Sequence, residues 1–466
     1  MNHDSKHASS PAAWAAARRS ACPGLVRVVA ARDGGLCRVR LPGGLLLATQ
    51  AHAIAAAALD HASGTLELTN RANLQVRGIR AGSEAALTAA LVEAGLGPSI
   101  SANASADLCA ADELRNLMLS PLAGHDGAAL VDTTALAAPI VAMLQDEPRF
   151  AALSPKFALL IDGGERLAAL DHPHDIWLAA ASSDSGECFM FGLAGCPADG
   201  AIGSIAATDA LTLIQALLHA FLDLAQPGQT RMRDVVATHG AQAVLEKAQE
   251  HALPPIARTH DWHRPHVDLA LRLGVHALNS NTSYIGCQPP LARLDAATLH
   301  ALATLAQTHG DGTLRITPWQ GAILPNIDNG VAQDVLESLQ TLGLIADAAH
   351  PLARTIACTG SAGCAKSRAD TKADALRLAA NLPPHVHVHL SGCERSCAAA
   401  HRAPFTLLAV APGAYDLYGH GTENNLVRDA DTAPFGHCVA RHLTIEAAAQ
   451  LLKQLPAQRP RSTSDV

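Results

Sequence analysis

The sequence predicts an α+β fold built from two pseudo-symmetric halves. Three observations predict it: a length of 466 residues, a tandem repeat, and the alternation of apolar and polar residues within each copy of the repeat. At roughly 150 residues per domain, this length corresponds to about three domains and is enough to bury a substantial core. Half-buried strands show such alternation, whereas the stretches that precede them have helical periodicity.

The repeat relates two segments that lie 248 residues apart. Residues 64–79 read GTLELTNRANLQVRGI and residues 312–327 read GTLRITPWQGAILPNI, with five identical positions in sixteen. Each copy follows an apolar helical stretch, at residues 52–62 and 296–308, so the expected unit is a helix followed by two strands. We therefore expect two fused halves related by a pseudo-twofold axis. The alternative is a chance likeness between two amphipathic hairpins in a chain rich in alanine and leucine.

The remaining segments complete the expected order of domains. Residues 1–21 are small and polar and have no leucine-rich apolar core, which favours a mobile tail over a signal peptide. After it we expect a first half-domain, a central α/β domain, a second half-domain and a last domain, at residues 22–98, 99–255, 265–345 and 346–466. A polar helix at 230–251, followed by Pro254-Pro255, marks the join between the halves.

Composition excludes several classes of protein. Hydrophobic residues make up 49% of the chain and charged residues 16%, which argues against disorder. The net charge of −8 gives no positive field for nucleic acid, so an anionic ligand must meet a local basic pocket. No run of apolar residues reaches the length of a membrane span, since the best one, at 207–224, contains two aspartates. We expect a cytoplasmic protein whose thiols stay reduced.

Four of the 11 cysteines fall within forty residues. They form a C-x5-C pair and a C-x3-C pair in glycine-bearing loops, with a helix (370–381) and a strand (385–390) between the pairs: Cys358, Cys364, Cys393 and Cys397. Four thiolates at loop tips can bind an iron–sulfur cube or a tetrahedral zinc ion. The five-residue gap favours the wider cube, although zinc and uncoordinated thiols stay open. The other seven cysteines have no ligand spacing and are expected to be small apolar residues, with Cys22 the one to check.

These cysteines and several motifs together resemble the nitrite/sulfite reductase superfamily, over nearly the whole chain from Cys22 onward. The motifs are the tandem repeat, TNRANLQ at 69–75, Arg115-Asn116, and Pro155-Lys156-Phe157. The resemblance implies paired ferredoxin-like half-domains and an iron–sulfur domain at 346–466. It also implies that Cys358, Cys364, Cys393 and Cys397 hold a 4Fe–4S cluster, and that the last of them bridges to a sirohaem iron in the reductases.

Within the superfamily, two features separate this chain from the anion-reducing members. Those enzymes carry a Lys-Phe-Lys run, where this chain has Lys156-Phe157-Ala158, and they are usually longer. The segments CPG (22–24), RNLMLSPLAG (115–124), LRITPW (314–319) and SGC (391–393) resemble instead the branch that hydroxylates precorrin-3A in aerobic cobalamin synthesis. This resemblance implies O2-dependent hydroxylation at C20 with γ-lactone formation. Sirohaem-dependent sulfite or nitrite reduction is the alternative, and a non-enzymatic metal scaffold the third.

The resemblance also implies which residues meet the substrate. A tetrapyrrole polycarboxylate needs several cations, and the planar forks of arginines grip carboxylates with two hydrogen bonds. The candidates are Arg71, Arg77, Arg115, Lys156 and Arg315, with Arg71 and Arg315 expected to face one cleft. A salt bridge is the alternative role for each. One expected cation is absent, because Gln320 stands where the family has arginine.

Oxygen chemistry implies further partners. A cube ligated only by cysteine carries electrons but has no open position, so the resemblance implies a second, mononuclear non-haem iron. It also implies an electron donor, either an NAD(P)H-linked reductase or a ferredoxin. The row of His385, His387 and His389 could ligate that iron, but a solvated edge strand is the commoner reason for such a row. Three more histidines are equally open: His401, His420 and His437.

Overall fold

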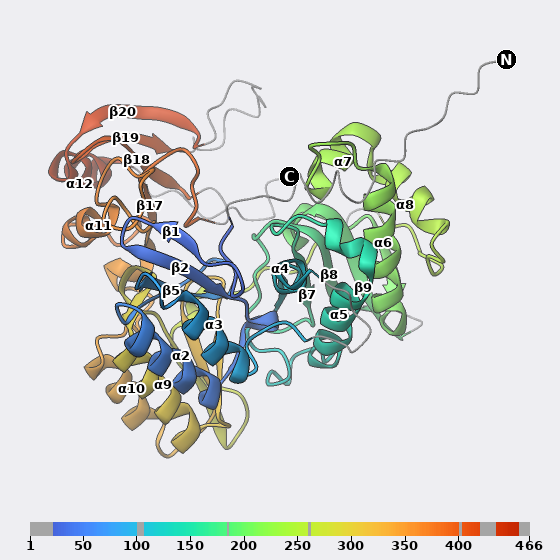
Figure 1. The fold of residues 1–466 in the computed structure, drawn as a ribbon, viewed down its shortest axis with the longest axis horizontal. Helices are drawn as coiled ribbons and strands as arrows, with labels where there is room; N and C mark the ends of the chain where they lie inside the picture. The colour runs from blue at the N-terminus through green and yellow to red at the C-terminus, as the bar shows by residue number, and fades with distance from the viewer. Residues whose placement is uncertain are drawn as a thin grey trace.

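The computed structural model describes residues 22–99, 107–183, 186–259, 262–399, 403–419 and 435–455. The tail expected at 1–21 lies outside the described residues, as do His401 and His420. The described chain forms four five-stranded sheets with helices packed against them (Figure 1). The predicted α+β fold with two pseudo-symmetric halves is therefore confirmed.

Two of the sheets belong to the repeats, and they exchange one strand with each other. The first has the order β1 (Val29–Ala31), β2 (Gly34–Val39), β5 (Leu74–Ile79), β4 (Thr65–Leu68) and β13 (Arg293–Asp295). The second has the order β11 (Gly274–Ala277), β12 (Thr282–Cys287), β15 (Ala322–Asp328), β14 (Thr313–Ile316) and β3 (Leu45–Leu47). Each half thus lends a three-residue strand to the sheet of the other half, so neither sheet is complete without its partner.

The helices of the repeats follow the same symmetry. Helices α2 (Ala48–His61) and α3 (Glu84–Glu93) cover the first sheet, and α9 (Ala296–His309) and α10 (Ala332–Thr341) begin and end 248 residues later. Buried alanines such as Ala51, Ala58 and Ala303 allow α2 and α9 to lie closely side by side (Figure 1). One hydrophobic core spans both halves.

Backbone conformation repeats even where the residue types differ. Gly43, Gly44 and Ala72 have positive φ angles of 67°, 70° and 52°. Their counterparts 248 residues later have φ angles of 51°, 67° and 62°, at Leu291, Ala292 and Gln320. Only glycine adopts this left-handed region without steric cost. The second half therefore keeps the shape of the first by accepting local strain that its packing stabilises.

The other two sheets follow the repeats in sequence and share one pattern of pairing. The central sheet has the order β10 (Gly203–Ala206), β9 (Gly186–Gly195), β8 (His174–Ser183), β7 (Leu159–Asp162) and β6 (Leu117–Leu119). The last has the order β16 (Thr355–Ala357), β17 (Val388–Ser391), β18 (Phe405–Ala411), β19 (Ala414–Gly419) and β20 (His437–Leu443). In each sheet the first three strands in sequence are parallel and the next two are antiparallel.

Helices cover these two sheets as well. The central domain has α4 (Leu108–Glu113), α5 (Thr134–Asp146), α6 (Ala210–Leu224), α7 (Met232–His239) and α8 (Ala241–Gln249), and the last domain has α11 (Thr371–Ala379) and α12 (Ile445–Gln454). The predicted single helix at 230–251 is wrong, because Gly240, with a φ of 80°, separates α7 from α8. The apolar stretch at 207–224 is the one described helix long and apolar enough to cross a membrane. Its buried face, including Leu213, Leu217 and Phe221, lies in the core of the central domain.

Candidate active site

The four clustered cysteines lie in two loops at the same edge of the last sheet. Cys358 directly follows β16, and Cys393 comes two residues after β17. Because β16 and β17 are parallel neighbours, their carboxyl ends meet at one edge. Helix α11 begins after the first loop, and the Asp370 side chain caps it by accepting a hydrogen bond from the Ala373 amide.

The thiols of these loops lie within electrostatic range of one another. The pKa of Cys397 is raised, first by desolvation and then by the charges of the other three cysteines of the cluster. The Cys358 sulfur accepts a hydrogen bond from the Gly392 amide at 3.3 Å and contacts the Thr371 hydroxyl at 3.3 Å. Four thiolates held together repel one another unless a cationic centre lies between them. The arrangement therefore fits a group that binds all four.

The spacing of the ligands favours a cluster over a single ion. In the part of the chain that the structure describes, no three His, Cys, Asp or Glu side chains converge closely enough for one metal ion. A tetrahedral zinc ion needs such convergence, with sulfurs about 2.3 Å from one centre, whereas a cube separates its ligands. The loops also need glycine, because a side chain at Gly363 would meet the Arg77 guanidinium at 2.6 Å. Cys358, Cys364, Cys393 and Cys397 stay the candidate ligands of an iron–sulfur cube.

The other described cysteines are of two kinds. Four are buried, namely Cys37, Cys188, Cys196 and Cys287. Desolvation raises the pKa of three of these thiols, to about 12 for Cys196 and Cys287 and further for Cys37. Such thiols are inert apolar residues. Cys22 differs, because its charge and that of Cys397 both act on the Arg38 guanidinium. Cys22 therefore lies near the cysteine loops.

The histidine row expected before Cys393 does not form. Strand β17 begins at Val388, so it contains only His389, which is buried, while His385 and His387 are exposed and precede the strand. Strand β17 is also an inner strand of its sheet, where the row was expected to lie on an edge. No described group of histidines and carboxylates is arranged for a mononuclear iron. That iron stays a prediction.

Arg38 is a cation near the cysteines that the sequence did not single out. Its Nε atom is buried and has no hydrogen-bond partner among the described residues. Burial lowers the pKa of Arg38, and the nearby Cys22 and Cys397 oppose this by raising it. A buried N–H group without a partner is costly unless a ligand supplies one. Arg38 is therefore a candidate for contact with an anionic ligand.

A small cavity of about 10 Å³ lies beside Arg71. Arg71 donates to the Lys156 carbonyl at 3.2 Å, and burial together with Arg231 and Arg38 lowers its pKa to about 10. The lining also includes Ala158 and His174. Burial lowers the pKa of His174 to about 3, so its imidazole is neutral, and it contacts the His172 carbonyl at 2.7 Å through Nδ1. Three of these residues were not singled out from the sequence: Arg38 and His174 lie on β2 and β8, and Arg231 directly precedes α7.

Arg115 has protein partners that account for its charge. Its Nη2 donates to Asp112 at 3.0 Å and to the Leu96 carbonyl at 2.6 Å. Asp112 also pairs with Arg40 at 3.3 Å. Asn116, next in sequence, donates to the Pro155 and Phe157 carbonyls at 2.7 and 3.2 Å, and so fixes the loop that carries Lys156. Arg115-Asn116 is thus a support for the cavity wall.

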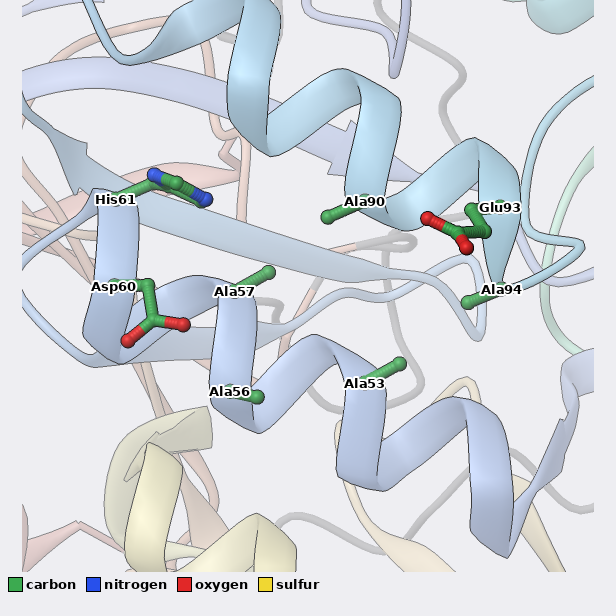
Figure 2. Close-up of a pocket in the computed structure, with 8 residues that line it drawn as sticks. All are labelled: Ala53, Ala56, Ala57, Asp60, His61, Ala90, Glu93 and Ala94. Atoms are coloured by element: carbon green, nitrogen blue, oxygen red, sulfur yellow. The ribbon is translucent and has the colours of Figure 1, made fainter.

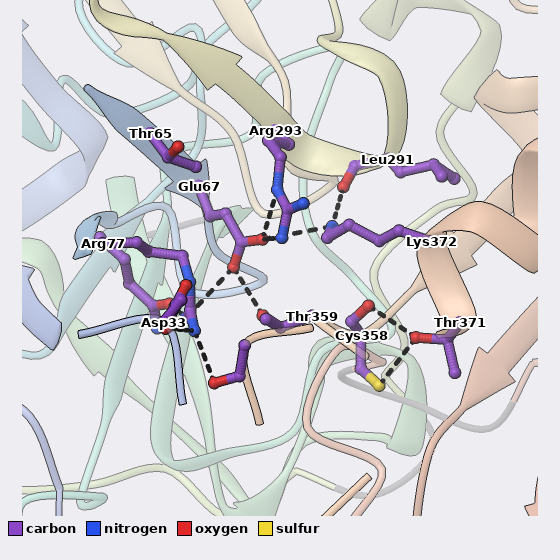
Figure 3. A network of polar contacts seen from close by, with 12 residues as sticks. Asp33, Thr65, Glu67, Arg77, Leu291, Arg293, Cys358, Thr359, Thr371 and Lys372 are labelled. Atoms are coloured by element: carbon purple, nitrogen blue, oxygen red, sulfur yellow. Dashed lines mark hydrogen bonds and ion pairs between the residues drawn. The ribbon is translucent and has the colours of Figure 1, made fainter. Parts of the chain in front are cut away.

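Arg77 and Arg315 lie away from the cavity. The Arg77 side chain is buried against Asp33 and Glu67 beneath the first cysteine loop (Figure 3). Arg315 donates to the Ala123 carbonyl at 3.2 Å. The charges that act on Arg315 are Asp311, Asp132 and Glu165, whereas other groups act on Arg71. Arg71 and Arg315 both donate to carbonyls of the central domain, at Lys156 and Ala123, and the expectation that they face one cleft stays a prediction.

A larger cavity, of about 330 Å³, lies between α2 and α3 (Figure 2). Its walls are mostly alanine, and its polar groups are Asp60, His61 and Glu93. Two carboxylates make it unsuited to a polycarboxylate ligand. The cysteine loops and the cations near Arg38 and Arg71 therefore form the candidate active site.

The fold and the four-cysteine site define a redox protein, and sequence profiles identify its family. The ferredoxin-like half domain of nitrite/sulfite reductases matches residues 30–94 and 276–342, and the nitrite and sulphite reductase 4Fe-4S domain matches residues 110–254. The chain belongs to the nitrite/sulfite reductase superfamily. The second match leaves out the four clustered cysteines, so their role rests on their own geometry.

Individual relatives come from two kinds of enzyme. A precorrin-3B synthase from Sinorhizobium sp. is 28% identical, over 88% of this chain and 85% of that protein. The chloroplastic ferredoxin–nitrite reductase of Zea mays is also 28% identical, over 78% of this chain and 67% of that protein. The structure of NirA from Mycobacterium tuberculosis superposes with a TM-score of 0.72 at 20% identity, over 89% of this chain and 79% of NirA. These relatives are oxidoreductases, and the NirA match shows the shared fold.

Proposed function

We propose that this chain hydroxylates precorrin-3A at C20 with O2, forming a γ-lactone, in aerobic cobalamin synthesis. One oxygen atom enters the ring and the other leaves as water, which requires two electrons from a donor. That donor is a ferredoxin or an NAD(P)H-linked reductase. The cytoplasm suits this chemistry, because thiols stay free there to bind a cluster. The resemblance to the precorrin-3B synthase, which extends over 85% of that protein, supports the proposal.

The observation that carries the proposal is the lining of the cavity beside Arg71. Ala158 lies there, at the position where the anion-reducing members resembled by the sequence have a second lysine. Reduction of sulfite or nitrite needs several charges around a small anion. A methyl group in that place removes one of them. The lining therefore favours a large organic substrate over a small inorganic anion.

The chain's own residues would bind and orient this substrate. Arg38, Arg71 and Lys156 would take its carboxylates, with Arg38 supplying a buried Nε–H group that has no hydrogen-bond partner among the described residues. His174, neutral at physiological pH, would donate or accept a hydrogen bond without adding charge. The cavity of about 10 Å³ is too small for a tetrapyrrole, so binding requires the surrounding loops to separate.

The four cysteines would hold a 4Fe–4S cluster, which supplies single electrons when bound. Cys358 and Cys393 stand at the ends of adjacent strands, so the cluster would be fixed to the sheet and not to a free loop. A second, mononuclear iron belongs to the proposal, although no described group of histidines and carboxylates is arranged to hold it.

The test is anaerobic purification, followed by an absorption spectrum with iron and acid-labile sulfide analysis. The proposal expects broad cluster absorption without a Soret band, and incorporation of one labelled atom from 18O2 into precorrin-3A. A stoichiometric sirohaem, together with sulfite or nitrite turnover, would support the reductase instead. The 28% identity to the maize ferredoxin–nitrite reductase keeps that function as the second candidate. Zinc without sulfide would contradict both.

A further inference from the structure

A buried carboxylate beneath the first cysteine loop is surrounded by three cations. Glu67, on β4, is 5% exposed. Its carboxylate lies 2.7 Å from Arg293, 3.5 Å from Arg77 and 3.6 Å from Lys372 (Figure 3). The Thr359 hydroxyl donates a fourth contact at 2.7 Å. Desolvation alone would raise the pKa of Glu67, but the three cations and the hydroxyl lower it to about 2.

The groups around Glu67 come from three parts of the chain. Arg77 lies on β5 of the first half, and Arg293 on β13, the strand that the second half lends to the first sheet. Thr359 and Lys372 belong to the last domain, where Lys372 also donates to the Leu291 carbonyl. One carboxylate therefore ties both halves of the repeat to the domain that carries the cysteines.

The contacts reach both ends of the first cysteine loop. Thr359 follows Cys358 in sequence, and Gly363, whose carbonyl accepts from Arg77 at 3.0 Å, precedes Cys364. Arg77 is in turn fixed by Asp33 at 2.9 Å. The loop is thus held next to each of its two cysteines by groups that meet at Glu67.

One of these cations, Lys372, lies within electrostatic range of Cys358. Cys358 and Glu67 are both among the charges that influence Lys372. Lys372 follows Thr371 in sequence, and the Thr371 hydroxyl lies 3.3 Å from the Cys358 sulfur. A cation close to a cluster favours the reduced, more negative form, and an adjacent carboxylate opposes that effect.

We propose that Glu67 is a positioning residue for the Cys358–Cys364 loop and that it lowers the reduction potential of the cluster by neutralising the cations beside Cys358. The inference rests on the cluster of the proposed function, but it does not depend on the substrate. The protein's own groups hold the loop, because Thr359 and Arg77 both contact Glu67.

The first experiment compares Glu67→Gln with a matched control, Asp416→Asn. Asp416 is another buried carboxylate paired with an arginine, Arg441, in the same domain as the cysteines. In the metal-free protein, the Gln variant should increase hydrogen exchange at the amides of residues 359–363 at least tenfold, and the control should not. After anaerobic reconstitution, the Gln variant should retain less than half of the wild-type iron and sulfide, and its remaining cluster should have a higher midpoint potential.

Two further variants separate charge from packing. Thr359→Val keeps every charge and removes one contact, so it should increase loop exchange and leave the midpoint potential at the wild-type value. Glu67→Ala opens a space lined by three cations and a hydroxyl, and added formate or acetate should restore both the slow exchange and the lower potential. Such rescue requires a carboxylate-binding role, because a space-filling role would not respond to a small anion.

Unchanged exchange and potential in Glu67→Gln would overturn the inference, as would an equal response of Asp416→Asn. The proposed function fails differently. If the wild-type protein binds zinc without sulfide, the cluster assignment is wrong, whereas the exchange comparison in the metal-free protein still decides whether Glu67 positions the loop.

Discussion

The central sheet and the last sheet each have a loop directly after their first strand in sequence. The two loops occupy equivalent positions but carry different side chains. In the central domain, Ser120 directly follows β6 and Asp126 comes six residues later. In the last domain, Cys358 directly follows β16 and Cys364 comes six residues later. Both sheets pair their strands in the same pattern. Two domains with the same strand pairing thus carry a hydroxyl and a carboxylate in one loop and two thiols in the equivalent loop.

The central loop is closed by groups of the protein itself. Ser120 donates to Asp162 at 2.9 Å, and Asp162 pairs with Arg264 at 2.6 Å. Asp126 pairs with Arg166 at 3.0 Å. Ser120 and Asp126 thus both have partners within the protein. The cysteine loop is different, because its thiols act on one another as like charges.

A buried glutamate beside each loop shows the same contrast. Glu67, under the cysteine loop, is ionised because three cations surround it, and its pKa is about 2. Glu165, beside Asp162, has a pKa of about 8, raised by burial and by the Asp162 carboxylate. One loop is therefore organised by a charge and the other by a retained proton. The surroundings of the two loops therefore differ in charge far more than in backbone structure.

The largest effect is expected from a variant that removes a proposed cluster ligand. Cys393→Ser should abolish the cluster and any turnover together, because a serine hydroxyl is a poor replacement for a thiolate ligand. Iron and sulfide per chain give the measure, and Cys438→Ser, at an exposed cysteine of the same domain, is the control. Turnover of precorrin-3A with O2 by the Cys393→Ser protein would refute the ligand assignment.

The next effect compares the contributions of a cation from each half, Arg38 and Arg315, to the affinity for the substrate. Arg38→Ala should weaken binding of a tetrapyrrole polycarboxylate about 10- to 100-fold, since a hydrogen bond to a charged group contributes about 1.5–3 kcal/mol. Arg315→Ala, at a cation that contacts the Ala123 carbonyl, should leave the affinity unchanged. Anaerobic absorption titrations with precorrin-3A measure both. Equal losses would mean that the substrate spans both halves.

Sequence reasoning recovered the repeat well because its physical basis is periodic. The offset of 248 residues, inferred from five identities, relates α2 to α9 and α3 to α10 without a shift. The exchanged strands β3 and β13 were not predictable, because three residues are too short to show alternation. The left-handed backbone at Leu291 and Ala292 was equally hidden, since neither is a glycine.

The site was predicted only as far as its motifs extend. The cysteine pairs could be found because the spacing of the ligands can be read directly from the sequence. The individual arginines could not be sorted, because a partner such as Asp112 for Arg115, or Glu67 for Arg77, is distant along the chain. The Arg-x-Arg pair at 38 and 40 was the one available signal for the missed cation. Arg38 lies on β2 and Arg40 directly follows this strand. Arg40 pairs with Asp112, whereas the Arg38 Nε atom has no partner among the described residues.

A smaller effect tests the proton retained at Glu165. Its folded pKa of about 8 exceeds its ordinary value of 4.5, so the folded protein binds more protons than the unfolded chain between these values. Stability should therefore fall as pH rises from 4.5 to 8, by at most about 1.4 kcal/mol per pH unit. Glu165→Gln should flatten this slope in denaturant titrations. Glu67 gives a slope of the opposite sign, because the stability of the wild-type protein falls as pH drops from 4.5 toward 2 and Glu67 loses its charge. Glu67→Gln should remove this slope and should lower the stability at higher pH.

The smallest effect tests whether the central loop is closed by ion pairs or by its hydroxyl. Ser120→Ala removes the donor to Asp162, which keeps its contacts with Arg264 and with the Gly164 amide at 3.1 Å. Because two partners remain, the free energy of unfolding should fall by only about 1 kcal/mol. Urea titrations at pH 7 measure the change, and a loss of several kcal/mol would show that the hydroxyl, and not Arg264, holds the loop. In that case the two loops would differ less than their charges suggest, since both would depend on the first residue after the strand.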